Sequence, residues 1–259
     1  MDGARWYHVT GDESKFQVAS NASKTDFAEY FRLDWDGAAT EREILRMGPE
    51  LEPYLSGLKG LRLLAPSDVN EVFFGFLCSA NNHLRRILPM VRRLGSYGPK
   101  VYQVAGRPAH AFPSASQIAA IPERELRDYG FGYRALTITR IAAEVAPRGD
   151  QWLYQLKKAG YKEAHAELMG IKGIGPKLAD CIALFGLHYV EAVPIDTHIW
   201  QAFTRLYFPD LRGAPLTDAR YRMAADSFRA RFGFLSGWAH QYLFYENVLS
   251  GGKRRSDGL

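Results

Sequence analysis

The stretch that decides the fold is Glu167-Leu168-Met169-Gly170-Ile171-Lys172-Gly173-Ile174-Gly175-Pro176-Lys177-Leu178-Ala179-Asp180-Cys181-Ile182. Residues 161–169 have the pattern of a short helix, and Gly170 is expected to end it in the left-handed region. Gly173 and Gly175 permit a tight turn in which the backbone approaches another molecule closely. Pro176 suits the first position of a second helix. The sequence therefore predicts two helices joined by a Gly-x-Gly hairpin.

Such a hairpin has two interpretations. The backbone N–H groups at the start of the second helix lie at the positive end of its dipole, so they could hold a nucleic-acid phosphate. Alternatively, the hairpin is a glycine-rich connection between helices that binds no ligand. The spacing of the glycines alone does not choose between the two.

Two polar residues near this hairpin could carry chemistry. Lys177 is in the first turn of the second helix, where the helix dipole disfavours a cation. A partly desolvated lysine there would have a lowered pKa and become a better nucleophile; alternatively, it extends to solvent or pairs with a phosphate. Further along, in Val193-Pro194-Ile195-Asp196-Thr197-His198, Asp196 has the features of an N-cap. It is either a rigidly held carboxylate with a chemical role or a structural cap.

The composition bounds the class of protein. The 259 residues are 47% hydrophobic and 13% aromatic, which suits one large folded domain or two small ones and excludes a disordered chain. No run of about 18 apolar residues is present, so no membrane span is expected. The first residues lack the apolar core of a secretory signal. Two cysteines, Cys78 and Cys181, are too few for a four-cysteine zinc site or iron–sulfur cluster.

Charge and hydropathy are unevenly distributed. The chain has a net charge of +5, and its acidic excess is concentrated in residues 1–60. The more basic remainder fits a polyanionic partner or a solvated basic surface.

The hydropathy pattern predicts the order of the elements. Residues 5–19 predict a β-hairpin, residues 27–35 a helix or an edge segment, and the pattern from residue 40 onward is helical. Asp68 is expected to open a buried helix, and residues 84–94 a second; later helices are expected to begin at Ser114, Pro122 and Tyr133, with two more in residues 215–248.

The pairing of residues 173–177 with residues 193–198 resembles the helix-hairpin-helix-Gly/Pro-Asp superfamily of DNA base-excision glycosylases. Within it, the similarity is greatest to 8-oxoguanine DNA glycosylase/lyases of the eukaryotic type. It extends over about residues 61–244 and includes three further segments in the family's order, at residues 76–83, 130–135 and 237–244. The resemblance implies a mainly α fold of two helical subdomains with a short β-containing N-terminal piece. We expect residues 1–40 to form that piece, 61–176 the first subdomain, and 41–60 with 177–259 the second.

The resemblance assigns the chemistry to Lys177 and Asp196. In the family, the hairpin lysine attacks C1′ of the damaged nucleoside, expels the base and forms a Schiff base that leads to strand cleavage by β-elimination. The aspartate stabilises the positive charge that develops on the sugar. The reaction as implied requires no cofactor and no iron–sulfur cluster.

Further residues match the family's DNA contacts. Asn81 matches the side chain that fills the gap left by the extruded base, and Tyr133 the wedge that buckles the neighbouring stack. Arg86 and Arg134 match the two arginines that read the orphaned cytosine, while His198 matches a phosphate contact. The backbone of Gly173 and Gly175 would approach the DNA. An alternative is that Arg86 is a solvated charge and Tyr133 a core aromatic residue.

The base pocket and a cation site are also implied. Cys181 and Phe244 match the residues that sandwich the extruded purine. The carbonyls of Met169, Ile171 and Ile174 match positions that hold a structural monovalent or divalent cation bridging to phosphate.

The sequence departs from the family at two places. His240 stands where the family has the glutamine that reads the Watson–Crick edge of the lesion. Gln241 is adjacent, but one residue along a helix turns a side chain by about 100°, so we do not expect it to substitute. At the N-terminus, the family has a glycine whose carbonyl detects N7–H of 8-oxoguanine. The counterpart of that glycine in this sequence is either Gly3 or absent. Both departures affect base discrimination.

We therefore expect a monomeric 8-oxoguanine DNA glycosylase/AP lyase acting opposite cytosine in double-stranded DNA, away from membranes and not secreted. It would be cytoplasmic beside the nucleoid in a bacterium, or nuclear in a eukaryote. One alternative is a related glycosylase/lyase for another lesion, although endonuclease III-like enzymes usually carry a four-cysteine cluster and alkyl-purine glycosylases lack the lysine. The other is a non-catalytic DNA-binding module, which would need the hairpin but neither Lys177 nor Asp196.

Overall fold

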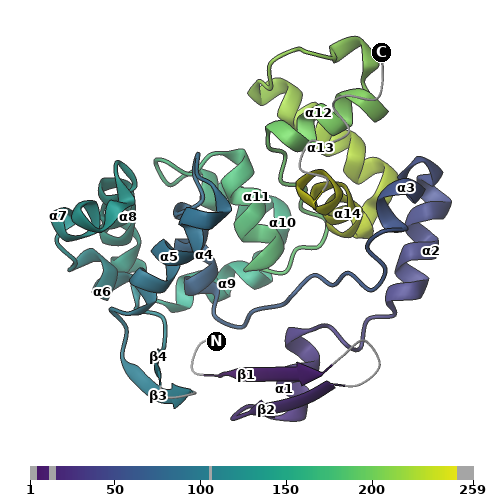
Figure 1. Cartoon of the computed structure of the whole chain (residues 1–259). Coiled ribbons are helices and arrows are strands. Elements are labelled where there is room, and N and C mark those ends of the chain that lie inside the picture. Colours follow the sequence, from purple (N-terminus) through teal and green to yellow (C-terminus); the bar gives the residue numbers. More distant parts are fainter. Residues whose placement is uncertain (1–4, 12–15, 105–106, 250–259) are drawn as a thin grey trace.

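The computed structural model describes residues 5–11, 16–104 and 107–249 (Figure 1). Its strands form two antiparallel pairs: β1 (Tyr7–Gly11) with β2 (Phe16–Ser20), and β3 (Lys100–Val104) with β4 (Arg107–His110). The helices before the second pair are α1 (Lys24–Tyr30), α2 (Gly37–Met47), α3 (Glu52–Leu55), α4 (Val69–Leu77) and α5 (Leu84–Gly95). The helices after it are α6 (Ala115–Ala119), α7 (Glu123–Leu126), α8 (Arg134–Val145), α9 (Gln151–Ala159), α10 (Tyr161–Met169), α11 (Pro176–Phe185), α12 (Thr197–Leu206), α13 (Asp218–Phe232) and α14 (Ser236–Leu249). The predicted mainly α fold is confirmed.

Short-range capping fixes where several helices begin. The Asp68 carboxylate accepts a hydrogen bond from the Glu71 N–H at 3.0 Å and opens α4. Ser114 opens α6 through a reciprocal pair of hydrogen bonds with Gln117. Pro122 and Tyr133 precede the first residues of α7 and α8. These predicted helix starts are confirmed. At Asp68 and Ser114 the side chain that caps the helix lies within one turn of the start.

The N-terminal strands pack on α1 rather than on a large core. The β1–β2 register places Tyr7 opposite Ser20, and the Tyr7 ring contacts Phe27, Tyr30 and Phe31. Residues 27–35, for which the sequence predicts a helix or an edge segment, begin within α1. The predicted hairpin is confirmed.

One hydrophobic core is formed by helices between α4 and α11. It buries residues from Val69 to Leu187, including Phe73, Phe74 and Phe131. These side chains are large and completely excluded from solvent, so their burial stabilises this half of the chain.

A second core combines both ends of the described chain. Ile44 of α2 and Leu55 of α3 pack with residues of α12, α13 and α14. Figure 1 shows the purple-blue helices α2 and α3 beside the yellow helices α13 and α14. Two cores thus lie side by side, joined by α11 and by the extended segment before α4.

Helix α11 contributes to both cores. Leu178 and Ile182 belong to the first core, whereas Ala183 and Leu184 belong to the second. The boundary predicted between residues 176 and 177 therefore falls at the start of a continuous shared helix, and the first core extends past it. The sequence pattern alone could not show this, because α11 is buried almost all round.

Candidate active site

The hairpin has the predicted form, with one correction. Helix α10 ends at Met169, and Gly170 has φ −66°, so the prediction of a left-handed cap at Gly170 was wrong. The left-handed residue is Gly173, with φ +102°. Gly175 is the extended N-cap of α11, and Pro176 occupies its first position. The turn therefore reverses at Gly173 and delivers the next helix with its N-terminus at the surface.

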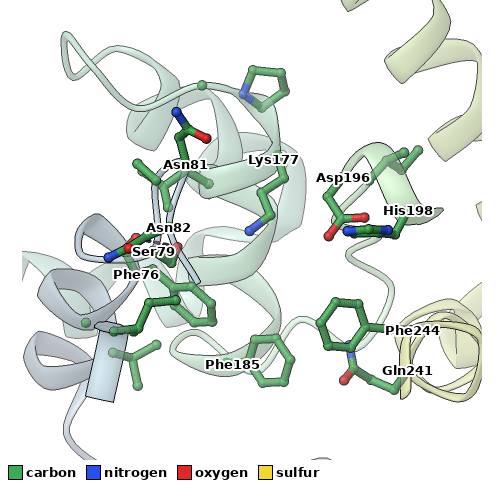
Figure 2. A pocket seen from close by; sticks show the side chains of 18 of the residues that line it. Phe76, Ser79, Asn81, Asn82, Lys177, Phe185, Asp196, His198, Gln241 and Phe244 are labelled. Atoms are coloured by element: carbon green, nitrogen blue, oxygen red, sulfur yellow. Dashed lines mark hydrogen bonds between the residues drawn. The ribbon is translucent and has the colours of Figure 1, made fainter. Parts of the chain in front are cut away.

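A cavity of about 1110 Å³ opens beside this hairpin. Lys177 of α11 and Asp196 before α12 both line it, and Figure 2 shows them facing each other across the space. Gly173, Gly175 and Asn81 are also among its lining residues. Residues from separate elements are thus brought together as the sequence motifs predict.

Asp196 is held in place by the helix that follows it. Its carboxylate accepts a hydrogen bond from the Ile199 N–H at 2.8 Å, so the predicted N-cap is confirmed. His198, in the first turn of α12, is exposed and lines the same cavity. The cap fixes the carboxylate while leaving its other oxygen available to the cavity.

Cys181 lies beneath Lys177 rather than among the residues that line the cavity. It is one turn further along α11 and only 4% exposed. Burial raises the pKa of the Cys181 thiol to about 11, although the Lys177 ammonium and its hydrogen bond to the sulfur oppose that shift. The thiol is therefore neutral at physiological pH and lies against the amino group of Lys177.

The structure corrects the expectation at His240. Its ring is 2% exposed and lies outside the set of cavity-lining residues, whereas Gln241 and Phe244 line the cavity. The Gln241 amide N–H donates to Nδ1 of His240 at 3.0 Å. Burial lowers the pKa of His240 to about 4, despite the nearby Pro194 carbonyl and Asp196 carboxylate. The residue that faces the cavity is thus Gln241, with a neutral His240 behind it.

The rotation of α14 about its axis determines that Gln241, and not His240, lines the cavity. Gly237 at its start donates its N–H to the Val190 carbonyl at 2.6 Å, and a Cβ there would lie 2.5 Å from both that oxygen and Leu184. This close approach presses the next turn of α14 against the segment before Asp196 and buries His240. Such tertiary packing has no local sequence signal apart from the glycine itself.

Aromatic rings form part of the cavity wall. Phe76 and Phe185 stack with ring centroids 5.5 Å apart, and both line the cavity. Phe244 lies near Gln241 on another side (Figure 2), with its ring nearly parallel to that of His240. Phe185 was not among the predicted site residues, and the α11 stripe gave only its apolar character. The wall suits a flat, partly apolar ligand.

At the rim of the cavity, the loop around Asn81 is tied to the residues before α8. Asn81 is exposed and has φ +46°, a conformation that asparagine tolerates better than most residues. The Tyr133 hydroxyl, on an exposed ring, donates to the Ala80 carbonyl at 3.1 Å. Arg86 is exposed and donates to the Gly130 carbonyl at 3.1 Å. The structure therefore gathers these predicted DNA contacts into one surface.

Arg134 does not project from that surface. It is 5% exposed, and its guanidinium donates to the carbonyls of Ala80 at 2.8 Å and Asn81 at 2.5 Å. The cation also lies over the Tyr133 ring. In this structure Arg134 thus holds the Asn81 loop, and it would have to exchange those partners to read a base.

The hairpin carbonyls are partly engaged. The Ile171 carbonyl accepts from the Ile174 N–H at 3.0 Å, and the Arg140 guanidinium donates to the Lys172 carbonyl in the same turn. Met169, also predicted as a cation ligand, is exposed at the end of α10.

Two further expectations concern the chain outside the cavity. Gly3 lies outside the described residues. Within the described part of the chain, no helix is long and apolar enough to cross a membrane.

Comparison with known proteins agrees with this arrangement. Residues 74–225, more than half of the chain, match the HhH-GPD superfamily of base excision DNA repair proteins. The chain belongs to that superfamily. This HhH-GPD protein is 41% identical over 198 residues to the N-glycosylase/DNA lyase OGG1 of Arabidopsis thaliana. The match covers 75% of this chain and 53% of the plant protein.

Two further relatives extend the similarity. The N-glycosylase/DNA lyase of Saccharomyces cerevisiae is 30% identical, covering 88% of this HhH-GPD chain and 67% of the yeast protein. The Clostridium acetobutylicum 8-oxoguanine glycosylase/lyase, solved with DNA that has cytosine opposite 8-oxoguanine, superposes with a TM-score of 0.79 at 28% identity. That match covers 95% of this chain and 82% of the clostridial one. The chain spans about half the length of the plant relative and two thirds of the yeast one.

Proposed function

We propose that this protein is a DNA glycosylase with AP lyase activity that removes 8-oxoguanine opposite cytosine from double-stranded DNA. The observation that carries the proposal is the placement of Lys177 and Asp196 on one cavity, with the hairpin at its rim. A non-catalytic DNA-binding module would need the hairpin but would have no use for an amine and a carboxylate facing each other. The cavity is large enough for a base extruded from the helix.

Each residue would act on a different part of the nucleoside. The neutral amine of Lys177 would attack C1′ while the bond from C1′ to the base nitrogen breaks, and the base would leave with that electron pair. The proton that the nitrogen then loses would pass to the departing base, and cleavage of the C1′–O4′ bond, with O4′ protonated by solvent, would open the sugar and give a Schiff base. Removal of a proton from C2′ would then expel the 3′ phosphate, which is β-elimination.

Asp196 would stabilise the sugar rather than the base. Positive charge develops on the deoxyribose as the base leaves, and a fixed carboxylate stabilises that charge without reorganising. The N-cap hydrogen bond to Ile199 supplies the fixed orientation.

Gln241 supports a guanine-type base. Because its amide N–H donates to His240, its oxygen remains as an acceptor on the cavity side. A guanine-type base offers N–H donors at N1 and N2, whereas adenine offers an acceptor at N1. Phe244 would stack on the purine, and Asn81 with Arg86 would face the cytosine left behind.

Other features of the site follow from the same proposal. The hairpin carbonyls of Met169, Ile171 and Ile174 would hold a structural cation, since neutral carbonyl oxygens suit a hard monovalent or divalent ion. The cation would supply positive charge that attracts a DNA phosphate, and it would take no part in the bond changes. A single chain would act alone, in the nucleoid of a bacterium or the nucleus of a eukaryote.

The test is borohydride trapping on a duplex with one 8-oxoguanine opposite cytosine. Wild type should form a covalent adduct, and Lys177→Gln should form none, because it lacks the amine that makes the reducible imine. Gln241→Ala should retain trapping on a ready-made abasic duplex but lose about 10-fold or more in excision of 8-oxoguanine. An undamaged duplex is the control for specificity.

The possible results separate the hypotheses. An adduct on the abasic duplex alone would keep the lyase and reject the lesion. Binding without an adduct on any duplex would reject the bifunctional mechanism in favour of a DNA-binding module.

A further inference from the structure

A buried polar cluster surrounds Asp180 of α11. Asp180 follows Lys177 by three residues, and its side chain is 1% exposed. The Tyr161 hydroxyl donates to one carboxylate oxygen at 2.6 Å, and the Tyr221 hydroxyl donates to the other at 2.5 Å. Arg229 in turn donates to the Tyr161 oxygen at 2.9 Å. A buried carboxylate is tolerated only with such partners, so the cluster has a defined geometry.

Tyr221 differs from Tyr161 because it also contacts the segment that carries Asp196. The Ile195 N–H donates to the Tyr221 oxygen at 3.3 Å, and Ile195 immediately precedes Asp196. Tyr221 is itself 5% exposed and is one of the residues that line the cavity. One hydroxyl group therefore joins the helix that bears the amine to the stretch of backbone that bears the carboxylate.

The direction of the hydrogen bonds makes this link specific. The hydroxyl has a single proton, and the Asp180 oxygen at 2.5 Å is a closer acceptor than the Val193 carbonyl at 3.3 Å. Burial and the Asp180 carboxylate raise the pKa of Tyr221 well above its usual range, so the proton stays on the hydroxyl. The oxygen is then free to accept from Ile195.

We propose that Tyr221, anchored on Asp180, is a positioning residue that sets the place of Asp196 relative to Lys177. The proposal rests on the glycosylase/lyase function proposed above. Displacement of a catalytic group by about 1 Å can cost roughly 100-fold in rate. The segment before Asp196 is irregular backbone, so it depends on contacts such as this one for its position.

The test compares Tyr221→Phe with Tyr161→Phe. Both variants remove one hydroxyl donor from Asp180, but only Tyr221→Phe removes the acceptor of the Ile195 N–H. Tyr221→Phe should slow single-turnover excision of 8-oxoguanine by about 10- to 100-fold, with little change in the Kd for lesion DNA. Tyr161→Phe should stay within about threefold of wild type. Trapping on a ready-made abasic duplex, which needs the amine but no departing base, should fall less than excision in Tyr221→Phe.

Several results would overturn the inference. Equal effects of the two variants on excision would mean that Tyr221 only satisfies Asp180, and equal loss of excision and abasic trapping would mean general disruption of the site. If Tyr221→Phe does not fold, hydrogen exchange in wild type answers the question: the Ile195 amide should exchange slowly, and rapid exchange would refute the link. An inactive wild type would instead reject the proposed function.

Discussion

His240 and Gln241 are adjacent on α14, yet they meet different surroundings. Gln241 lines the cavity, while His240 is buried behind it and accepts the Gln241 hydrogen bond. A protonated imidazole could not accept that bond at Nδ1. The neutral state of His240 is therefore part of what orients the amide.

This burial has a consequence for stability against acid. The pKa of His240 is lowered from near 6.5 to about 4 in the folded protein, so the unfolded chain binds its proton first as the pH falls. The stability contributed by neutral His240 is complete above about pH 6.5 and is lost as the pH falls toward about 4. The loss should amount to about 3 kcal/mol in the free energy of unfolding.

Urea unfolding of wild type and His240→Gln at a series of pH values measures it. The glutamine variant lacks this titration, so the difference between the two free energies should change by that amount between about pH 7 and pH 4. Parallel pH profiles would contradict the prediction.

Residue positions were predictable where their signals are local. Lys177 and Asp196 stand next to a helix-starting proline and within an N-cap, so their neighbours in sequence determine where they lie. The exchange between His240 and Gln241, and the burial of Arg134, depend on how whole helices are rotated against one another. No pattern within a single helix contains that information.

The hairpin between α10 and α11 shows how an element can use two glycines differently. Gly173 has φ +102°, and a Cβ there would lie 3.0 Å from the Arg140 guanidinium. Gly175 is extended, and a Cβ added to it would meet nothing within 4 Å. The fold therefore needs a glycine at residue 173 but not at residue 175. The open space around Gly175 suits the approach of a ligand.

Alanine substitution should separate the two roles. Gly173→Ala should lower the free energy of unfolding by about 1 to 3 kcal/mol because the backbone conformation is strained for an L-residue. Gly175→Ala should leave it within about 0.5 kcal/mol but weaken binding to duplex DNA. Thermal melting and a DNA titration check both; equal melting temperatures for the two variants would contradict the assignment.

Elements with strong end signals were predicted well, and weakly marked ones were not. The starts of α6, α7 and α8 followed from Ser114, Pro122 and Tyr133. The β3–β4 pair was missed, because its strands are short, Tyr102 is 41% exposed, and Pro108 stands within β4. Such strands lack the regular alternation that marks a buried sheet.

Across the whole molecule, charge is divided as the sequence indicates, with the acidic excess in residues 1–60 and the basic excess beyond. Neutralising several phosphates should make DNA binding fall steeply with salt. Lys172 is exposed in the hairpin, whereas Lys59 is exposed in the segment between α3 and α4.

The salt dependence should assign the DNA face. Lys172→Gln should reduce the slope of log K against log salt by about one, and Lys59→Gln, which removes the same charge, should leave it unchanged. Binding curves over a range of KCl concentrations measure both slopes. Equal slopes for the two variants would show that the hairpin does not contact phosphate.

Helix α11 packs into both cores, and this sharing bears on how the protein loses its structure. Neither half can melt and leave the core of the other half intact, because both cores include side chains of α11. Unfolding should therefore be a single cooperative transition in spite of the two cores. Amide hydrogens in the buried middle of α11 should then exchange with solvent only when the whole molecule unfolds.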